Sequence, residues 1–170
     1  MQESPSQSSK LLTGERGLPS NYPSPLHKNL LFYIQHNRDC NTVIYDINIK
    51  EDGQIDEENP IKVYWKMYSN GKIISQLNKF QENLAYGYQF TQKRINCYEF
   101  NLVSYDKVKF YLRKYQGQFR IVTKVNNIWS IVEHIYVFVE NLGLFQKVKF
   151  AEIYGFDLRY NIPVYQKINN

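Results

Sequence analysis

Residues 41–49 read "NTVIYDINI", a run in which a large apolar side chain recurs at every second position. Successive side chains of an extended strand point to opposite faces, so this spacing gives the strand one continuous apolar face. That face consists of Val43, Tyr45, Ile47 and Ile49. Upstream, "LLFYIQH" (30–36) is a second strand-like run, and the "NRDC" between the two indicates a hairpin turn. The sequence therefore predicts that a β-hairpin opens the folded part of the chain.

Strand-like runs continue to the C-terminus. The 170 residues include 15 Tyr and 10 Phe, and aromatic and β-branched residues suit pleated, half-buried strands. Turn residues such as "YQG", "VNN" and "NLG" fall between the later runs. The further runs are 61–68, 86–92, 95–103, 107–115, 118–125, 128–140 and 145–158. About nine strands at such short spacing predict an all-β fold, an antiparallel barrel or sandwich, formed as one domain by residues 30–170.

One segment, "SQLNKFQENLAYG" (75–87), breaks the two-residue pattern. Its large apolar residues recur at helical spacing instead: Leu77, Phe80 and Leu84. Ser75 is suited to cap the start of a helix, and Gly87 to end it in a left-handed conformation. We therefore expect one short helix here.

Residues 1–29 differ in composition from the rest. They contain six Ser and four Pro and few large apolar side chains. Such a stretch buries too little surface to offset its ordering entropy, so we expect an extended or disordered N-terminal arm that becomes ordered when a neighbour covers it.

Positive charge is concentrated after residue 60. Up to Pro60 the chain has 5 basic and 9 acidic residues, and beyond it 16 basic and 7 acidic. The candidate binding face consists of Lys107, Lys109, Tyr111, Arg113, Tyr115, Lys147 and Lys149. If their two strands are neighbours, these side chains form one cationic face for an acidic protein surface, an anionic lipid or a nucleic acid. The alternative is an ordinary solvated outer face whose lysines prevent edge pairing.

The acidic stretch 37–60 superficially resembles a calcium-binding loop. When Gly53 is set at the position where such a loop requires glycine, Lys50 falls where an oxygen ligand is needed. We therefore predict no tightly bound metal and interpret the stretch as a solvated acidic connection. A looser site remains as the alternative, and it would use Asp52, Asp56, Glu57 and Glu58.

No catalytic or cofactor motif is present in the sequence. Phosphate-cradling glycine loops, nucleophile elbows and paired metal-binding cysteines are missing. A zinc site built from His36, Cys40, Cys97 and His134 would match no known spacing. We interpret both histidines as ordinary strand residues with a polar edge in water. The cysteines fit two free thiols in a reducing compartment or a single bridge in an oxidising one.

Several stretches together resemble an uncharacterised family, the domain of unknown function numbered 4833. They are "LFYIQHNRDCNTVIYDINIKEDGQID", "NPIKVYWKMY", "LNKFQENLAYGY" and "VKFAEIYGFDL". The resemblance covers roughly residues 30 to 165 and departs from the family pattern at "RDC" in the first turn. It implies one self-contained domain in which Trp65, Tyr86 and Gly87 are framework, with Tyr64 on the opposite face of the Trp65 strand. Because the activity of the family is unknown, the resemblance identifies no catalytic residue in this sequence. Some members of the family begin with secretion signals.

These observations favour a non-enzymatic domain that works by binding. The first hypothesis is a small basic component of a larger protein assembly, held through the arm and the cationic face. The alternative is a ligand-carrying β-barrel with an aromatic-lined cavity for an apolar small molecule or lipid. No cofactor is expected. No apolar run approaches the roughly 18 residues that cross a bilayer, and the start has no signal-peptide core, so we expect a soluble protein, intracellular or secreted after removal of a signal.

Overall fold

The computed structural model describes residues 22–143 and 145–170, so most of the predicted arm lies outside the described residues. Within that part of the chain, eleven strands form one sheet. The strands are β1 (Leu30–His36), β2 (Asp39–Ile47), β3 (Ile61–Met67), β4 (Ile73–Gln76), β5 (Tyr88–Arg94), β6 (Cys97–Leu102), β7 (Tyr105–Tyr115), β8 (Gln118–Val125), β9 (Ile128–Leu142), β10 (Phe145–Asp157) and β11 (Pro163–Asn169). A short α2 (Lys79–Gln81) continues into the π-helical turn η1 (Glu82–Tyr86). The all-β prediction with one short helix is confirmed.

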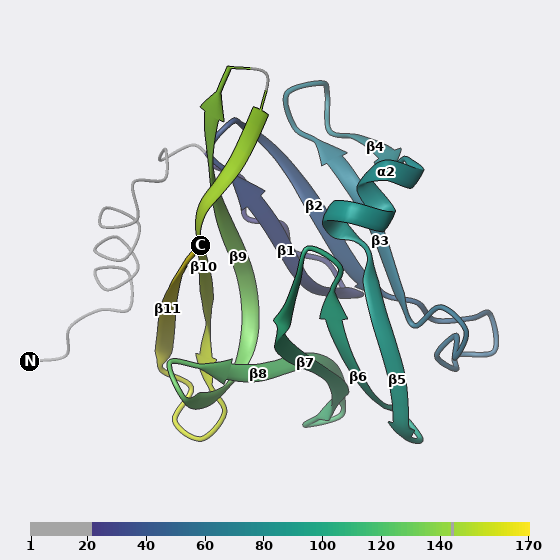
Figure 1. The fold of residues 1–170 in the computed structure, drawn as a ribbon. Coiled ribbons are helices and arrows are strands. Elements are labelled where there is room, and N and C mark those ends of the chain that lie inside the picture. Colours follow the sequence, from purple (N-terminus) through teal and green to yellow (C-terminus); the bar gives the residue numbers. More distant parts are fainter. Residues whose placement is uncertain (1–21, 144) are drawn as a thin grey trace, which may run out of the picture.

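The sheet curls around its longest strand, β9. Its order is β4-β3-β2-β1-β9-β8-β7-β6-β5, and β10 and β11 continue from the other edge of β9. Along one edge, the first part of β9 pairs with β8 and the second part with β1. Because two strands share one edge, the sheet cannot stay flat and folds over into the curled shape of Figure 1.

The prediction that all strands are antiparallel is wrong at one place. β1 and β9 run parallel, in register from Tyr33 opposite His134 to His36 opposite Val137. A hairpin turn forces its two strands to be antiparallel, but no turn joins β1 to β9, so nothing local sets their relative direction. Two-residue alternation is the same in both orientations, and the sequence pattern therefore could not reveal this pair.

The strand count also exceeds the expected nine. The two additional strands are β4, whose last two residues were expected to begin the helix, and β11, at the C-terminus. Every residue of β4 is exposed, and β11 alternates exposed and half-buried side chains. Both strands lie at free edges of the sheet, where pairing with one neighbour does not require an apolar face.

The helix begins and ends for other reasons than expected. Asn78, not Ser75, caps it: its side chain accepts from the Gln81 N–H, and the Gln81 side chain accepts from the Asn78 N–H. Gly87 is not left-handed, since its φ is −68°. A Cβ on Gly87 would instead lie 1.9 Å from the carbonyl oxygen of Glu82. Glycine is required there by the close approach of two backbone segments.

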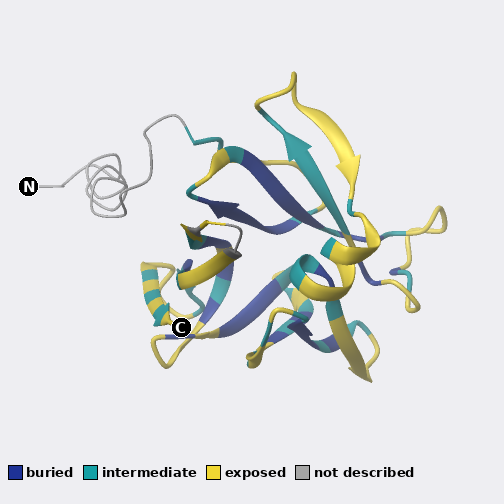
Figure 2. Cartoon of the chain, turned by 45° about the horizontal axis from the view of Figure 1, so that its top comes forward, coloured by how far each residue is buried: buried dark blue, intermediate teal, exposed yellow. Residues whose placement is uncertain are grey.

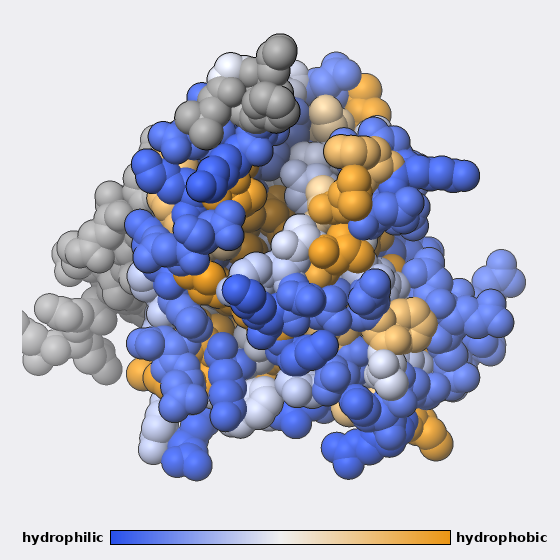
Figure 3. Space-filling view, viewed as in Figure 1, coloured by the Kyte–Doolittle hydropathy of each residue, from blue (hydrophilic) through white to orange (hydrophobic). Residues whose placement is uncertain are grey.

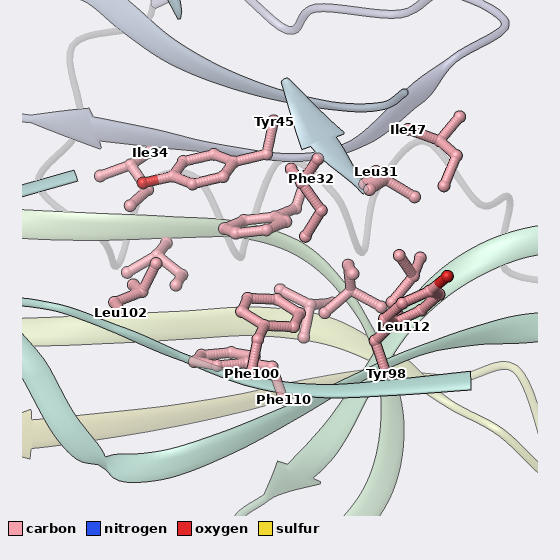
Figure 4. Close-up of a cluster of buried hydrophobic side chains, with 14 of the residues drawn as sticks. Leu31, Phe32, Ile34, Tyr45, Ile47, Tyr98, Phe100, Leu102, Phe110 and Leu112 are labelled. Carbon is pink, nitrogen blue, oxygen red and sulfur yellow. The ribbon is translucent and has the colours of Figure 1, made fainter. Parts of the chain in front are cut away.

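The core lies between the β1–β2 hairpin and the β6–β7 hairpin. Phe32 stacks on Tyr45 with ring centroids 4.2 Å apart, and Phe100 stacks on Phe110 at 5.3 Å. Figure 4 shows these two pairs facing each other across the interior. Full burial of each ring contributes roughly 1.5–3 kcal/mol. The predicted apolar face of residues 43–49 belongs to this core, which confirms the alternation.

The last part of the predicted arm lies against its own chain. The Tyr22 hydroxyl donates to the His36 carbonyl (2.5 Å), and the Gln35 amide donates to the Pro23 carbonyl (2.6 Å). The His27 ring lies 2.7 Å from the Asp46 carboxylate on β2. This segment lies against the outer side of β1 and β2, whose inward side chains the core buries. β1 and β2 are mostly buried in Figure 2, while β4 is exposed.

Candidate functional site

An apolar pocket of about 390 Å³ opens between two walls of the curled sheet. One wall consists of the inner faces of β9, β10 and β11, and the other of η1 and the start of β7. Figure 3 shows hydrophobic surface in the recess between these walls and hydrophilic side chains around it. The apolar lining residues are Ile34, Leu84, Ala85, Leu102, Val108, Phe110, Ile135, Val137, Val139, Val148, Ala151, Ile153 and Ile168.

Strand alternation and one bulge place these side chains on the same wall. On β9, Val137 and Val139 are two residues apart and share the inner face. On β10, Val148 and Ala151 are three residues apart, which in a regular strand would put them on opposite faces. A register shift between Val148 and Phe150 inserts one extra residue, so both Val148 and Ala151 line the pocket.

The polar lining residues divide into a rim and one buried group. The exposed ones are Ser104, Gln146, Asn169 and Asn170, and the tyrosines Tyr86 and Tyr105 are half-buried. His36 is only 7% exposed, and its Nδ1 atom has no hydrogen-bond partner among the described residues. No Lys, Arg, Asp or Glu side chain is among the residues that line the pocket. The lining itself is thus uncharged, and the Arg38 guanidinium donates to the lining residue Gln146 at 2.7 Å. One buried polar atom, Nδ1 of His36, lacks a partner among the described residues.

Aromatic packing fixes the position of His36. Its ring meets Trp65 edge to face at 5.8 Å, and Trp65 meets Tyr86, another lining residue, at 5.2 Å. Burial lowers the pKa of His36, Asp39 opposes that shift, and Arg38 adds to it. The ring is therefore neutral near pH 7. The expectation that its polar edge lies in water is wrong, because the ring packs inside the curled sheet.

The predicted framework aromatics lie on two sides of the sheet. Trp65 and Tyr86 pack against the core. Tyr64 points to the outer side, where its hydroxyl donates to the Asp46 carboxylate at 2.8 Å. Burial and this hydrogen bond raise the pKa of Tyr64. Only Tyr86 of the three contributes directly to the pocket lining.

The residues of the predicted cationic face are not brought together. β8 and β9 lie between β7 and β10 in the sheet. The Thr123 hydroxyl bonds the carbonyl of Lys109, and Thr123 pairs with Ser130 near the start of β9. Lys147 instead pairs with Glu140 near the end of β9. The two lysine groups therefore lie toward opposite ends of the longest strand.

Within β7 and β10, the predicted binding residues have individual contacts. Tyr111 packs edge to face on Trp129, and the Tyr115 hydroxyl donates to the Leu158 carbonyl at 2.8 Å. Lys149 lies 3.5 Å from Glu140. Lys107, Lys109 and Lys147 are exposed, and Lys109 also reaches Asn101 at 3.4 Å, whereas Arg113 is half-buried. These contacts are those of an outer sheet face.

The acidic stretch forms a compact connection between β2 and β3. Asp52 accepts the Gln54 N–H, and Asp56 accepts the N–H groups of Glu58 and Asn59. These carboxylates thus stabilise turns of the backbone. Across the described residues, no three His, Cys, Asp or Glu side chains gather where they could hold a metal ion. Both cysteines are free.

A larger hollow of about 730 Å³ lies between β3 and β5, where the two ends of the curled sheet face each other. Its lining includes the charged Lys62 and Glu82. The Tyr88 hydroxyl reaches across it to the N–H and carbonyl of Ile61, at 3.0 and 2.9 Å. The lining mixes these charged residues with apolar ones such as Val63, Leu77 and Phe90, and the Tyr88 side chain partly closes the hollow.

Sequence reasoning missed a second polar group, on the outer faces of β9, β10 and β11. Glu152 accepts hydroxyls from Tyr154 (2.6 Å) and Tyr165 (2.9 Å). The His134 ring lies against Tyr154 at 4.6 Å and Tyr33 at 5.2 Å. The alternation of Glu152 and Tyr154 with apolar neighbours was the available signal. Neither the apolar pocket nor the hollow between β3 and β5 is lined by these residues.

Comparisons with known proteins give one family. A family model described as a domain of unknown function (DUF4833) matches residues 32–167, which confirms the resemblance noted in the sequence. No curated protein and no solved structure matches the chain. Within the described residues, no helix has the length and apolar character needed to span a membrane.

Proposed function

The chain belongs to the DUF4833 family, whose description assigns no activity, and we propose that this protein works by binding a small apolar molecule in the pocket between β9–β10 and η1–β7. The observation that carries the proposal is the aliphatic lining of that pocket. Its volume of about 390 Å³ falls in the range of roughly 300–1,000 Å³ that is usual for small-molecule sites.

The chemistry of the lining supports binding over catalysis. The buried polar side chain of the pocket is the His36 imidazole, and the lining includes no carboxylate, thiol or amine that could act with it. The one serine hydroxyl of the lining, on Ser104, is exposed and has no hydrogen bond to His36 among the described contacts. General acid–base and nucleophilic mechanisms need such a partner within hydrogen-bond reach. The lining is more aliphatic than the aromatic cavity expected from composition, because the tyrosines and phenylalanines fill the core and the outer faces instead.

Affinity follows from apolar burial. Each methylene group removed from water contributes roughly 0.8 kcal/mol, and drug-sized ligands retain about 0.3 kcal/mol or more per non-hydrogen atom after the cost of association. At that value a ligand of ten to twelve atoms gains roughly 3–3.6 kcal/mol, so we expect a dissociation constant on the order of a few millimolar or tighter.

The test uses N-phenyl-1-naphthylamine, a neutral apolar probe whose fluorescence rises in apolar surroundings. Ala151→Phe places a phenyl ring inside the pocket and should weaken probe binding at least tenfold. Ile74→Phe adds the same group to β4, where Ile74 is 58% exposed and outside the pocket, and should leave binding unchanged. Thermal melts check that both variants fold. Equal probe binding by Ala151→Phe and the wild type would refute the proposal.

The second candidate is the protein-assembly role predicted from the sequence. It is favoured by the exposed apolar side chains of β4 and the helical turn, namely Ile73, Ile74, Phe80 and Leu84. Against it, the predicted lysines do not form one surface, and residues 22–29 contact their own chain. Size-exclusion chromatography of the purified chain, with mass spectrometry of what co-purifies, separates the candidates: a bound apolar molecule supports the first and a defined protein partner the second.

A further inference from the structure

The apolar pocket has a positive charge beside it that its lining does not include. The Arg38 guanidinium donates to the side-chain oxygen of Gln146 at 2.7 Å, and Gln146 is an exposed residue of the lining. Resting on the proposed function, we propose that the natural ligand is an aliphatic monocarboxylate, such as a medium-chain fatty acid, whose chain fills the pocket and whose carboxylate pairs with Arg38.

The turn that carries Arg38 is fixed against the pocket wall. Arg38 lies between β1 and β2, next to Asn37. The Asn37 side chain accepts from the N–H of Val139 at 2.7 Å and donates to the carbonyl of the same residue at 3.0 Å. Val139 lines the pocket, so these two hydrogen bonds hold the turn at one end of the lining. The fold therefore places Arg38 there, and the flexible arginine side chain does not have to do so alone.

The charge of Arg38 also acts on two other lining residues. Burial raises the pKa of Tyr86, and Arg38 opposes that shift. Burial lowers the pKa of His36, and Arg38 adds to that shift. Asp39 acts in the opposite sense to Arg38 on both groups. Since Gln146, Tyr86 and His36 belong to β10, η1 and β1, Arg38 lies near the point where these three elements meet around the pocket.

Arg38 is available to pair with an incoming anion. Its side chain is exposed, and no ion pair joins it to an acid among the described residues. The neighbouring Asp39 uses its carboxylate to accept the N–H of Asn41 at 2.8 Å. A guanidinium has five N–H donors, and the hydrogen bond to Gln146 uses one of them. Donors therefore remain for a carboxylate.

The lysines of β10 near this end have other positions. Lys149 lies 3.5 Å from Glu140, and Lys147 is opposite Glu140 in the strand register. Gln146 and Val148 line the pocket, so strand alternation places Lys147 on the other face of β10. A single guanidinium suits a single negative charge. A carboxylate carries one charge and can accept two parallel hydrogen bonds from arginine, whereas a phosphate monoester carries nearly two charges at pH 7.

The two parts of a fatty acid match the two environments. The aliphatic lining accommodates the alkyl chain, whereas a charge buried among these side chains without a partner would be very costly. Beside the exposed Gln146 and Arg38, the carboxylate stays partly in water and keeps most of its hydration. An alkylammonium group in the same place would meet a like charge.

The experiment compares three ligands with one alkyl chain: octanoate, 1-octanol and octylammonium. Each competes with N-phenyl-1-naphthylamine for the full-length chain. Arg38→Gln should weaken octanoate binding about three- to fivefold, the upper part of the range for an exposed ion pair. It should leave 1-octanol unchanged and strengthen octylammonium. Arg94→Gln removes the same charge from the exposed end of β5, outside the pocket, and should change none of the three.

Salt and a conservative variant separate charge from shape. Raising the ionic strength from about 0.01 M to 1 M shortens the Debye length from roughly 30 Å to 3 Å. The affinity for octanoate relative to 1-octanol should then fall in the wild type and stay nearly constant in Arg38→Gln. Arg38→Lys keeps the charge but loses the planar fork, so its affinity for octanoate should lie between those of the wild type and Arg38→Gln.

The possible outcomes separate the two proposals. If neither the probe nor any of the three compounds binds, the proposed function fails and this inference fails with it. If 1-octanol binds but octanoate binds equally well to Arg38→Gln and the wild type, or if Arg94→Gln weakens octanoate as much as Arg38→Gln does, only the inference is overturned.

A measurement on the wild type keeps the inference testable if Arg38→Gln does not fold. With nitrogen-15 label in the arginine side chains, octanoate should shift the Nε–H resonance of Arg38 more than 1-octanol does. Arg94, which lies outside the pocket, is the internal control. An unchanged Arg38 resonance at saturating octanoate overturns the inference.

Discussion

Replacing Gly87 by alanine tests how the helical turn is fixed over the core. The φ of Gly87 is −68°, a value that alanine adopts freely, so backbone preference alone predicts a gain of roughly 0.4–1 kcal/mol through the unfolded state. The structure predicts the opposite. The new Cβ would lie 1.9 Å from the Glu82 carbonyl oxygen, and ordinary contact begins at 3.4 Å, so η1 must move by about 1.5 Å, the difference between these distances.

The magnitude follows from what η1 holds. Moving the turn that far breaks the hydrogen bond from the Val103 N–H to the Gly87 carbonyl (2.9 Å) and the one from the Tyr45 hydroxyl to the Tyr86 carbonyl (2.7 Å). Each bond contributes roughly 1 kcal/mol, and the buried Tyr45 hydroxyl left unpaired costs about 1–2 kcal/mol more. Once the gain through the unfolded state is subtracted, the free energy of unfolding should fall by about 3 kcal/mol. For a chain of this length, that corresponds to a fall in Tm of roughly 6–12 °C.

The assay is urea and thermal unfolding followed by circular dichroism, with Gly117→Ala as the matched control. Gly117 has a φ of +79°, and a methyl group added there would have nothing within 4 Å, so alanine meets only backbone strain of about 1–2 kcal/mol. Gly87→Ala should be the more destabilising change. The reasoning is refuted if Gly87→Ala unfolds with the wild type, or if Gly117→Ala costs more.

Three further changes have defined outcomes. Tyr45→Phe should lower the free energy of unfolding by about 1–2 kcal/mol, because the Tyr86 carbonyl loses its donor; an unchanged urea midpoint would contradict this. Gly155→Ala should destabilise by about 3 kcal/mol in the same assay, because a Cβ there would lie 2.1 Å from the Ile131 carbonyl oxygen in the neighbouring β9. Burial raises the pKa of Tyr88 from 10.0 to about 12, so the stability that comes from its neutral phenol is complete below pH 10 and is lost as the pH rises from about 10 to about 12. Urea titrations across that range should show a smaller pH dependence in Tyr88→Phe than in the wild type.

Local patterns predicted the strands but not how distant strands meet. Val43 and Tyr45 entered the core as their spacing indicated. β11 was missed because Pro163 begins it and its side chains are only half-buried, so no apolar run marks it. The parallel pairing of β1 with β9 depends on contacts between segments far apart in the chain, on which two-residue alternation carries no information.

The pocket could not be predicted from the sequence, because it also depends on contacts between segments far apart in the chain. Its lining comes from η1 and several distant strands, and on β10 it depends on the bulge near Val148, which no residue pattern announced. His36 looked like any strand histidine. Its significance arises only when Trp65 and Tyr86 close around it. The two groups of lysines lie apart for a related reason, since similar local patterns in β7 and β10 do not show whether the two strands are neighbours.

The parallel pairing of β1 with β9 also sets the order in which the protein can be completed during its synthesis. Tyr33 leaves the ribosome 101 residues before its partner His134, as their numbers show. At roughly 5–20 residues per second, the open edge of the β1–β2 hairpin waits on the order of 5–20 s for β9 to be made. During that interval a nascent chain presents a nearly all-apolar strand edge, the surface that holding chaperones bind. Slow codons between β2 and β9 should therefore lower the soluble yield more than slow codons placed after β9.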